Sequence, residues 1–253
     1  MLNADLYPEL SRRKSFHLFR GVGSGTISAE ELAALEEAWR GFEPLYPGIR
    51  TAIRVVPASE FPFKRDAEYC VLIYSEQKEN YLMNAGYLGE QLDLWLVSRG
   101  IGSLWYGLGK PDAAEYDGLG YVIMIAVRKV SDPSLFRKDV FKAKRKALSE
   151  IWEGETLPFS DLVRFAPSAC NSQPWTVRNE AGRLTVFRYK KQAKIGIMSE
   201  KAAFYYNRID IGIFLCFMEI CMAKEGEARS RALFPDSVDA EYSKVAEYSP
   251  ETA

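Results

Sequence analysis

Apolar and polar positions follow two different periods along the chain, and these periods predict where helices and strands lie. In residues 83–102, MNAGYLGEQLDLWLVSRGIG, the apolar side chains recur at helical spacing from Leu88 to Leu96, and Gly100 is placed to end the helix. Runs rich in Val, Ile and Tyr predict strands instead. These runs are AIRVVPASEF (52–61), YCVLIYSE (69–76), YVIMIAVRK (121–129) and RLTVFRYKK (183–191). The mixture is an α+β pattern.

Further helices are predicted on both sides of these strands. In TISAEELAALEEAWRGF (26–42), Ser28 is a candidate N-cap and Glu31 its capping-box partner. The run IGIFLCFMEICMA (211–223) contains Glu219, which favours a helix buried in protein over one buried in lipid. Helices are also expected within KDVFKAKRKALSEIWEGE (138–155) and PFSDLVRF (158–165), whereas the segment after Pro235 is polar and weakly patterned.

Two segments of the chain can be aligned with each other. Residues 84–100 and 210–226 each read as a polar residue, a glycine, a largely apolar helix and a final glycine, with Gly86 opposite Gly212. A duplication predicts two related halves, residues 1–155 and 156–253, packed together as one compact unit. The alternative is a chance match between two buried helices.

Composition narrows the classes of function. The chain has 253 residues, 47% of them hydrophobic and 26% charged, which is ordinary for a globular protein. The net charge of −1 predicts neither nucleic-acid nor membrane binding. Four cysteines without a CxxC pair, and His17 as the single histidine, predict no metal site and a reducing, cytoplasmic setting. No stretch without charges is long enough to span a membrane.

Three short stretches carry candidate chemistry. SRRKSFHLF (11–19) gathers cations and a hydroxyl that can bind a phosphate, although a solvated basic face has the same composition. LVSRGIGSLWYGLGKP (96–111) has glycines that let backbone amides approach a ligand. APSACNSQPW (166–175) concentrates small polar groups in one loop. Within it Cys170 is expected to fill space rather than react.

Together these stretches resemble a known family. RRKSFHLF resembles the RRSxRxF opening of the FMN-dependent nitroreductase family, APSACNSQPW resembles its APSxxNxQPW loop, and RGIGSLWYG resembles its LGLGTxWxG segment. VRKVSDPSLFRKDVF (127–141) resembles the strand exit and basic residues that follow. The first two motifs lie about 150 residues apart here. That order resembles the single-chain "putative TM nitroreductase" branch, in which one chain imitates a dimer.

The resemblance implies a nitroreductase-like fold with one FMN between the halves. The implied phosphate and ribityl ligands are Arg13, Lys14 and Ser15, with Arg137 or Lys138. His17 would lie near the pyrimidine edge of the ring. Pro167, Ser168, Ala169 and Asn171 would meet the flavin from the other half, and the backbone of Trp105, Tyr106, Gly107 and Leu108 would face N5.

The implied activity passes hydride from NADH or NADPH to flavin N5 and then reduces a nitroaromatic, quinone or flavin acceptor. The flavin carries this chemistry, so no catalytic side chain is expected. Two alternatives remain: a flavoprotein of this fold with another reaction, or a degenerate protein that has lost the cofactor. His17 and the altered stretch GFEPLYPG (41–48) favour the degenerate form, and the intact APSACNSQPW loop argues against it. A monomer or weak homodimer is expected.

Overall fold

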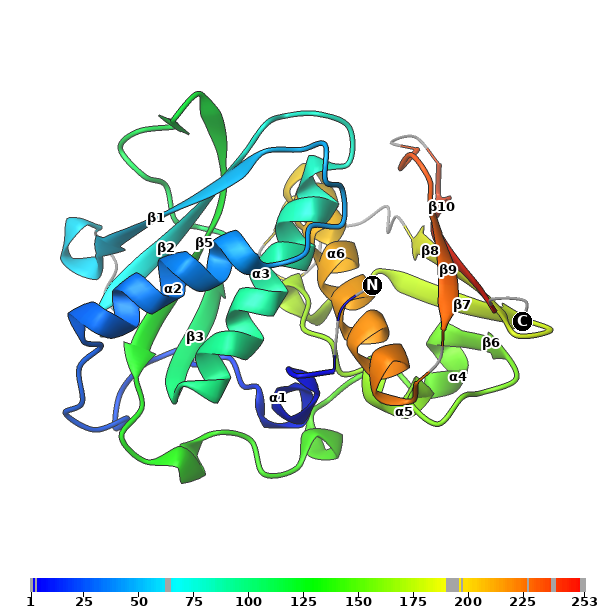
Figure 1. Cartoon of the computed structure of the whole chain (residues 1–253), viewed down its shortest axis with the longest axis horizontal. Coiled ribbons are helices and arrows are strands. Elements are labelled where there is room, and N and C mark those ends of the chain that lie inside the picture. Colours follow the sequence, from blue (N-terminus) through cyan, green and yellow to red (C-terminus); the bar gives the residue numbers. More distant parts are fainter. Residues whose placement is uncertain are drawn as a thin grey trace.

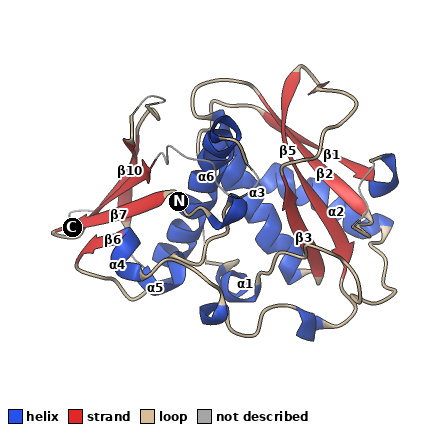
Figure 2. Cartoon of the chain, turned by 180° about the vertical axis from the view of Figure 1, so that it is seen from behind, coloured by secondary structure: helices blue, strands red, loops and turns tan. Residues whose placement is uncertain are grey.

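A computed structural model describes residues 2, 4–61, 65–189, 196, 198–226, 228–237 and 240–250. Two β-sheets lie on opposite sides of a central pair of long helices, so the architecture is α+β, as the sequence predicts (Figure 1). Figure 2 shows the same layers from behind.

The first sheet is wholly antiparallel and has the strand order β1-β2-β5-β3, with β4 added at one end of β5. Its strands are β1 (Thr51–Pro57), β2 (Tyr69–Ser75), β3 (Ile101–Tyr106), β4 (Glu115–Tyr116) and β5 (Leu119–Lys129). Strands β1, β2 and β5 confirm predicted strands. Strand β3 lies in the glycine-rich stretch 96–111, for which the sequence predicts no strand. Its Gly102 leaves space for the ring of Phe16, since a Cβ there would lie 2.9 Å from that ring.

The second sheet has the order β6-β7-β8-β10-β9, with β6 and β7 parallel and the other neighbours antiparallel. Its strands are β6 (Trp152–Gly154), β7 (Trp175–Glu180), β8 (Arg183–Tyr189), β9 (Arg229–Leu233) and β10 (Tyr242–Pro250). The first of the predicted strand residues 183–191 form β8, whereas 190 and 191 lie outside the described residues. The weakly patterned segment after Pro235 contains β10, which pairs with strands on both sides and buries Val245, Ala246 and Tyr248.

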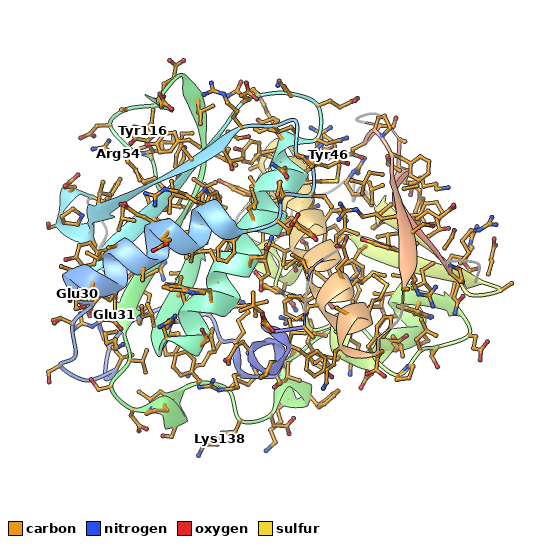
Figure 3. The ribbon with its side chains drawn as sticks, viewed as in Figure 1. Glu30, Glu31, Tyr46, Arg54, Tyr116 and Lys138 are labelled. Carbon is orange, nitrogen blue, oxygen red and sulfur yellow. The ribbon has the colours of Figure 1, made fainter. Side chains whose placement is uncertain are left out.

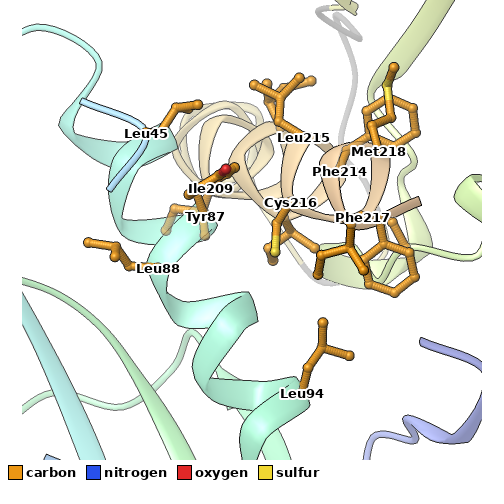
Figure 4. Packing of buried hydrophobic residues seen from close by; sticks show 14 of the residues in the cluster. Leu45, Tyr87, Leu88, Leu94, Ile209, Phe214, Leu215, Cys216, Phe217 and Met218 are labelled. Carbon is orange, nitrogen blue, oxygen red and sulfur yellow. The ribbon is translucent and has the colours of Figure 1, made fainter. Parts of the chain in front are cut away.

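Helices α3 (Tyr81–Ser98) and α6 (Glu200–Lys224) form the middle of the molecule. Figure 4 shows apolar side chains of both helices, among them Tyr87 and Phe217, gathered where the two helices meet. The buried helix predicted over 211–223 is confirmed, and Gly100 ends α3 in a left-handed conformation, with a φ of 67°. The glycines aligned from the sequence, Gly86 and Gly212, both lie at the contact between α3 and α6.

The remaining helices are short, apart from α2 (Ala29–Gly41) beside the first sheet. Its predicted capping box is present: the Glu31 N–H donates to Ser28 Oγ at 3.2 Å, and the Ser28 N–H donates to Glu31 Oε2 at 3.0 Å. The others are α1 (Tyr7–Arg12), α4 (Leu148–Ile151) and α5 (Ser160–Val163), with 3₁₀ turns η1 (Ala58–Glu60), η2 (Pro133–Leu135), η3 (Val140–Lys142) and η4 (Ala169–Asn171).

The helix expected within residues 138–155 is largely wrong. The only helical elements described there are the short η3 and α4, and Trp152–Gly154 forms strand β6 instead. The stretch between η3 and α4 is an extended connection between the two sheets. Its closely spaced cations, Lys142, Lys144, Arg145 and Lys146, would repel one another along a helix. The predicted boundary between halves falls one residue after β6, which belongs to the second sheet. The division itself stays a prediction, and its two ends, residues 1 and 253, lie outside the described residues. Among the described helices, none has the length and hydropathy needed to cross a bilayer.

Candidate functional site

A cavity of about 260 Å³ lies between the first sheet and α6. Small-molecule sites in proteins typically measure about 300–1,000 Å³, so this cavity is slightly smaller than that range. Ten of the fourteen residues predicted from the sequence line it: Arg13, Ser15, His17, Trp105, Tyr106, Gly107, Leu108, Pro167, Ser168 and Ala169. The structure thus brings together three motifs that lie far apart in the chain.

The opening motif reaches the cavity because it lies along β3. Ser15 forms a parallel bridge with Ser103, and the Phe16 N–H donates to the Ser103 carbonyl at 2.9 Å. The bridge places Arg13 and Ser15 at the cavity wall. His17 is exposed, and its carbonyl accepts a hydrogen bond from Arg65, another lining residue, at 2.7 Å.

Arg13 lies among two buried carboxyl groups of α3. Its Nε donates to Asp93 Oδ2 at 2.7 Å and lies 3.4 Å from Glu90 Oε1, while Nη2 donates to Ser15 Oγ at 3.3 Å. Burial alone would lower the pKa of Arg13, but the charges of Asp93 and Glu90 outweigh it and raise that pKa. Burial raises the pKa of Glu90 well above its usual value, although the positive charge of Arg13 acts in the opposite direction.

Asp93 also connects Arg13 to the end of β3. Its Oδ2 accepts from Trp105 Nε1 at 2.9 Å, and its Oδ1 accepts from the Ser103 hydroxyl. One buried carboxylate therefore orients two residues of the cavity wall, Arg13 and Trp105, together with Ser103 behind them, and Trp105 has a structural role here in addition to lining the cavity.

The wall opposite β3 comes from α6 and the loop at 166–175. The Tyr206 hydroxyl donates to the Gly107 carbonyl, and a Cβ on Gly107 would lie 2.7 Å from Cζ of Tyr206. Ala169 N–H donates to Asp210 Oδ1 at 2.9 Å, which holds the loop against α6. The loop turns tightly, since Cys170, Asn171 and Gln173 all have positive φ.

Asp210 is a buried acid that lines the cavity. Burial raises the pKa of Asp210 to about 8, although hydrogen bonds from the Ala169 N–H and the Ser172 hydroxyl act in the opposite direction. The side chain is therefore mostly protonated at neutral pH. A neutral acid at this position removes one negative charge that would oppose an anionic ligand.

Trp175, which ends the loop motif, does not line the cavity. It is fully buried, and its ring stacks on Phe214 with 4.7 Å between centroids, so it anchors the loop to α6 as a core residue. Its role in the loop is therefore structural.

Four of the predicted residues lie outside the cavity: Lys14, Arg137, Lys138 and Asn171. Lys14 donates to the Leu135 carbonyl at 2.9 Å, and Arg137 donates to the Arg13 carbonyl at 3.2 Å. Lys138 projects from the edge of the molecule, as Figure 3 shows. Asn171 accepts a hydrogen bond from Arg145 at 2.9 Å.

Sequence reasoning missed several lining residues, chiefly Arg65, Met198, Tyr206, Ile209, Asp210 and Ile213. Four of them follow the helical spacing of α6, at positions 206, 209, 210 and 213. The internal alignment contained a usable signal, since it paired Asp210 with Asn84 as polar residues two positions before Gly212 and Gly86. Among the described residues, no cluster of His, Cys, Asp and Glu could hold a metal ion.

The family described as "Putative TM nitroreductase" matches residues 5–222. A Thermotoga maritima structure described as a putative nitroreductase has 15% identity and a TM-score of 0.62, covering 99% of this chain and 95% of that one. This match confirms the nitroreductase-like fold.

Two shorter structures are also similar. A nitroreductase family protein from Clostridium difficile 630 has 17% identity and a TM-score of 0.44, and it covers 62% of this chain and 100% of its own. A putative nitroreductase from Desulfovibrio desulfuricans, solved in complex with FMN, has 15% identity and a TM-score of 0.42, with the same coverage of 62% and 100%. The comparison with curated proteins gives no match.

Proposed function

Because the chain belongs to the family described as "Putative TM nitroreductase", we propose that it is an FMN-dependent oxidoreductase of nitroreductase type. Its donor would be NADH or NADPH, and its acceptor a nitroaromatic, a quinone or a free flavin. The observation that carries the proposal is the cavity, because residues that the motifs assign to a flavin site meet there from both sides of the molecule. When bound, FMN supplies the redox chemistry.

The residues present fit a flavin in three respects. Flat walls come from Trp105, Tyr106 and Tyr206, which suit a planar ring. Because Gly107 has no side chain, the Tyr206 ring lies directly against its backbone, which keeps the two walls of the cavity close together. Arg13 and Arg65 contribute positive charge to the wall. Asp210 also lies on the wall, but it is mostly protonated at neutral pH and adds little negative charge.

Each side of the cavity has a distinct task in this proposal. The loop at Pro167–Ala169, held by Asp210, would orient the ring from one side. The backbone at Trp105–Leu108 would face its reactive edge from the other. Closing the site between a sheet and a helix also excludes water from the ring. The protein would therefore bind and orient, and no side chain needs to form a covalent bond.

A second, smaller cavity supports one flavin per chain. When α3 is aligned with α6 through Asn84 and Asp210, Asn80 takes the place of Tyr206 and Met83 the place of Ile209. Both line a cavity of about 180 Å³ with Arg208 and Asp236. Arg208 and Asp236 pair there at 2.8 Å, and Arg188 also donates to Asp236 at 2.8 Å. The counterpart of the first cavity is thus partly filled by its own ion pairs.

The first test is the absorbance spectrum of the purified protein, followed by release and identification of any bound flavin. We expect about one FMN per chain. Oxidation of NADH and of NADPH should then depend on a quinone or nitroaromatic acceptor. A chain that binds no flavin after incubation with excess FMN would refute the proposal. Flavin binding without nicotinamide oxidation would point to another reaction on the same fold.

A further inference from the structure

The smaller cavity, of about 180 Å³, lies where the start of α3 meets α6 and the connection between β9 and β10. Its lining residues are Lys78, Glu79, Asn80, Tyr81, Leu82, Met83, Arg208 and Asp236. A water molecule needs about 10–15 Å³ of such space, so the cavity holds several waters or one small molecule. The proposed flavin lies in the other cavity, which leaves this one without a role in the proposed function.

Arg208 of α6 lines this cavity with donors that are not in use. Its Nε donates to Asp236 Oδ2 at 2.8 Å, and its guanidinium carbon lies 4.4 Å from the centre of the Phe204 ring, so the group is held in place. Neither Nη atom has an acceptor among the described residues. The two Nη groups form a planar fork, and a carboxylate matches such a fork with two parallel hydrogen bonds.

The charges beside this fork do not balance. Asp236 accepts from Arg208 and, through Oδ1, from Arg188 Nε at 2.8 Å, so one carboxylate serves two guanidinium groups. Arg188 is fully buried outside the lining, and its Nη1 is shielded from solvent without an acceptor in the described part of the chain. The three side chains together carry one positive charge. Holding that charge away from water costs free energy, which a monovalent anion beside Arg208 would offset.

The start of α3 supplies further donors. Asn80 is the N-cap residue, but its side chain makes no capping hydrogen bond, and its Oδ1 accepts from the Asp236 N–H at 3.1 Å instead. The N–H groups of Leu82 and Met83, two buried lining residues, have no acceptor among the residues that the structure describes. Buried backbone N–H groups are rarely left without a partner, and the first turn of a helix carries partial positive charge. These groups therefore favour an anion in the cavity.

The acids of the wall limit the charge that a ligand can carry. Asp236 and Glu79 both line the cavity, and Glu79 is exposed. Lys78 also lines it, but its Nζ pairs with Glu76 at 2.9 Å. Two carboxylates repel a dianion more strongly than a monoanion. The cavity thus suits a single negative charge spread over two oxygens in one plane, which is the form of a carboxylate.

We infer that this cavity binds a small monocarboxylate, whose oxygens accept hydrogen bonds from the Nη groups of Arg208 and from the N–H groups of Leu82 and Met83. The inference goes beyond the proposed function and does not depend on it, since none of these groups lines the proposed flavin cavity. When α3 is aligned with α6, the two cavities are counterparts, and they then bind ligands of different chemical classes.

The test uses acetate as the probe and follows the amide signals of Leu82 and Met83 by nitrogen–proton correlation NMR. In the buffer of the purified protein, sodium chloride is replaced stepwise by sodium acetate, or by sodium sulfate, at constant ionic strength. The variants are Arg208→Ala and Arg208→Lys. Lys201→Ala is the matched control, since Lys201 is an exposed cation of the same helix outside the cavity. Circular dichroism confirms that each variant is folded.

We expect acetate to move both amide signals along a saturable curve in the millimolar range, because so small a ligand makes few contacts. Sulfate should bind more weakly. Arg208→Ala should weaken acetate binding at least about tenfold and still fold, since Asp236 keeps its pair with Arg188. Arg208→Lys should have intermediate affinity, because an ammonium group cannot make both parallel hydrogen bonds. Lys201→Ala should match the wild type.

Three results would overturn the inference: no movement of the Leu82 and Met83 signals on exchange into acetate, an equal or stronger response to sulfate, or unchanged acetate affinity in Arg208→Ala. If Arg208→Ala does not fold, Arg208→Lys decides, and wild-type affinity in that variant would count against the site. Flavin content measured on the same samples keeps the proposed function separate. A chain without flavin can still bind acetate, and a chain with flavin can fail to bind it.

Discussion

Gly86 of α3 and Gly212 of α6 make reciprocal contacts at the crossing of the two helices. A Cβ on Gly86 would lie 2.0 Å from the carbonyl oxygen of Ile209, and a Cβ on Gly212 would lie 1.9 Å from the carbonyl oxygen of Met83. Each glycine therefore lets the backbone of the other helix approach directly. The cavity depends on this approach, because α6 carries one of its walls.

Replacing either glycine with alanine should force the helices apart. We expect Gly86→Ala and Gly212→Ala each to lower the free energy of unfolding by about 2–3 kcal/mol, since backbone cannot move aside as a side chain can. Urea unfolding followed by circular dichroism measures this. Gly41→Ala is the control, because nothing lies within 4 Å of a Cβ there and alanine favours a helix. Equal stability in all three variants would contradict the close crossing.

Asn84 and Asp210 have equivalent roles on the two helices. Asn84 Oδ1 accepts from the Tyr46 N–H at 2.9 Å, and Asp210 Oδ1 accepts from the Ala169 N–H at 2.9 Å. Each holds a loop to its helix. An asparagine can therefore perform the structural task of Asp210 without carrying a titratable group.

This equivalence predicts how stability changes with pH. The pKa of Asp210 is raised to about 8 by burial, above its usual value of 3.8, so between these values the folded chain binds a proton that the unfolded chain releases. Asp210 therefore makes stability fall as pH rises from 4 to 8, by at most about 1.4 kcal/mol per pH unit. Asp210→Asn should flatten this slope. Denaturant unfolding at several pH values measures this. If the free energy of unfolding falls equally with pH in the wild type and in Asp210→Asn, the raised pKa of Asp210 is contradicted.

Gly107 should limit the width of the cavity. A side chain there would push against Cζ of Tyr206 at 2.7 Å and disturb the hydrogen bond from the Tyr206 hydroxyl to the Gly107 carbonyl. We expect Gly107→Ala to weaken FMN binding at least about fivefold, with riboflavin affected equally because the phosphate is not involved.

The double variant Gly107→Ala, Tyr206→Ala should recover part of this affinity, since removal of the ring makes room for the methyl group. Gly48→Ala serves as the control, with nothing within 4 Å of its Cβ. Fluorescence titration measures all three variants. Unchanged affinity in Gly107→Ala would show that this part of the wall does not contact the flavin.

Glu219 should be a major determinant of stability. Its buried carboxylate accepts from the hydroxyls of Tyr87 at 2.6 Å and Tyr248 at 2.8 Å and from Arg231 at 2.8 Å, which joins α3, α6, β9 and β10. Glu219→Ala leaves these donors unpaired and should cost about 3–5 kcal/mol.

The control for this variant is Glu180→Ala, whose side chain is 71% exposed and lies 3.9 Å from Arg178, and which should change stability by less than about 1 kcal/mol. Chemical denaturation compares the two. A loss in Glu219→Ala no larger than in the control would mean that the four elements are held together in other ways.

The sequence by itself determined the elements whose cause is local. The capping box at Ser28 and the termination of α3 at Gly100 depend on residues within one turn. The burial of α6 follows from its apolar run, and the strands β1, β2 and β5 follow from their β-branched residues. The three motifs that resemble a flavin site could also be recognised in the sequence, because each is a contiguous stretch of residues.

Tertiary structure alone decided the rest, since the causes are distant in the chain. Strand β10 forms because two neighbours pair with it, although its own pattern is weak. Asp93 compensates Arg13 across 80 positions, while Arg145 is left among cations. No motif distinguishes a paired arginine from an unpaired one. Charge balance depends on which groups folding brings together, so it cannot be read from either motif alone.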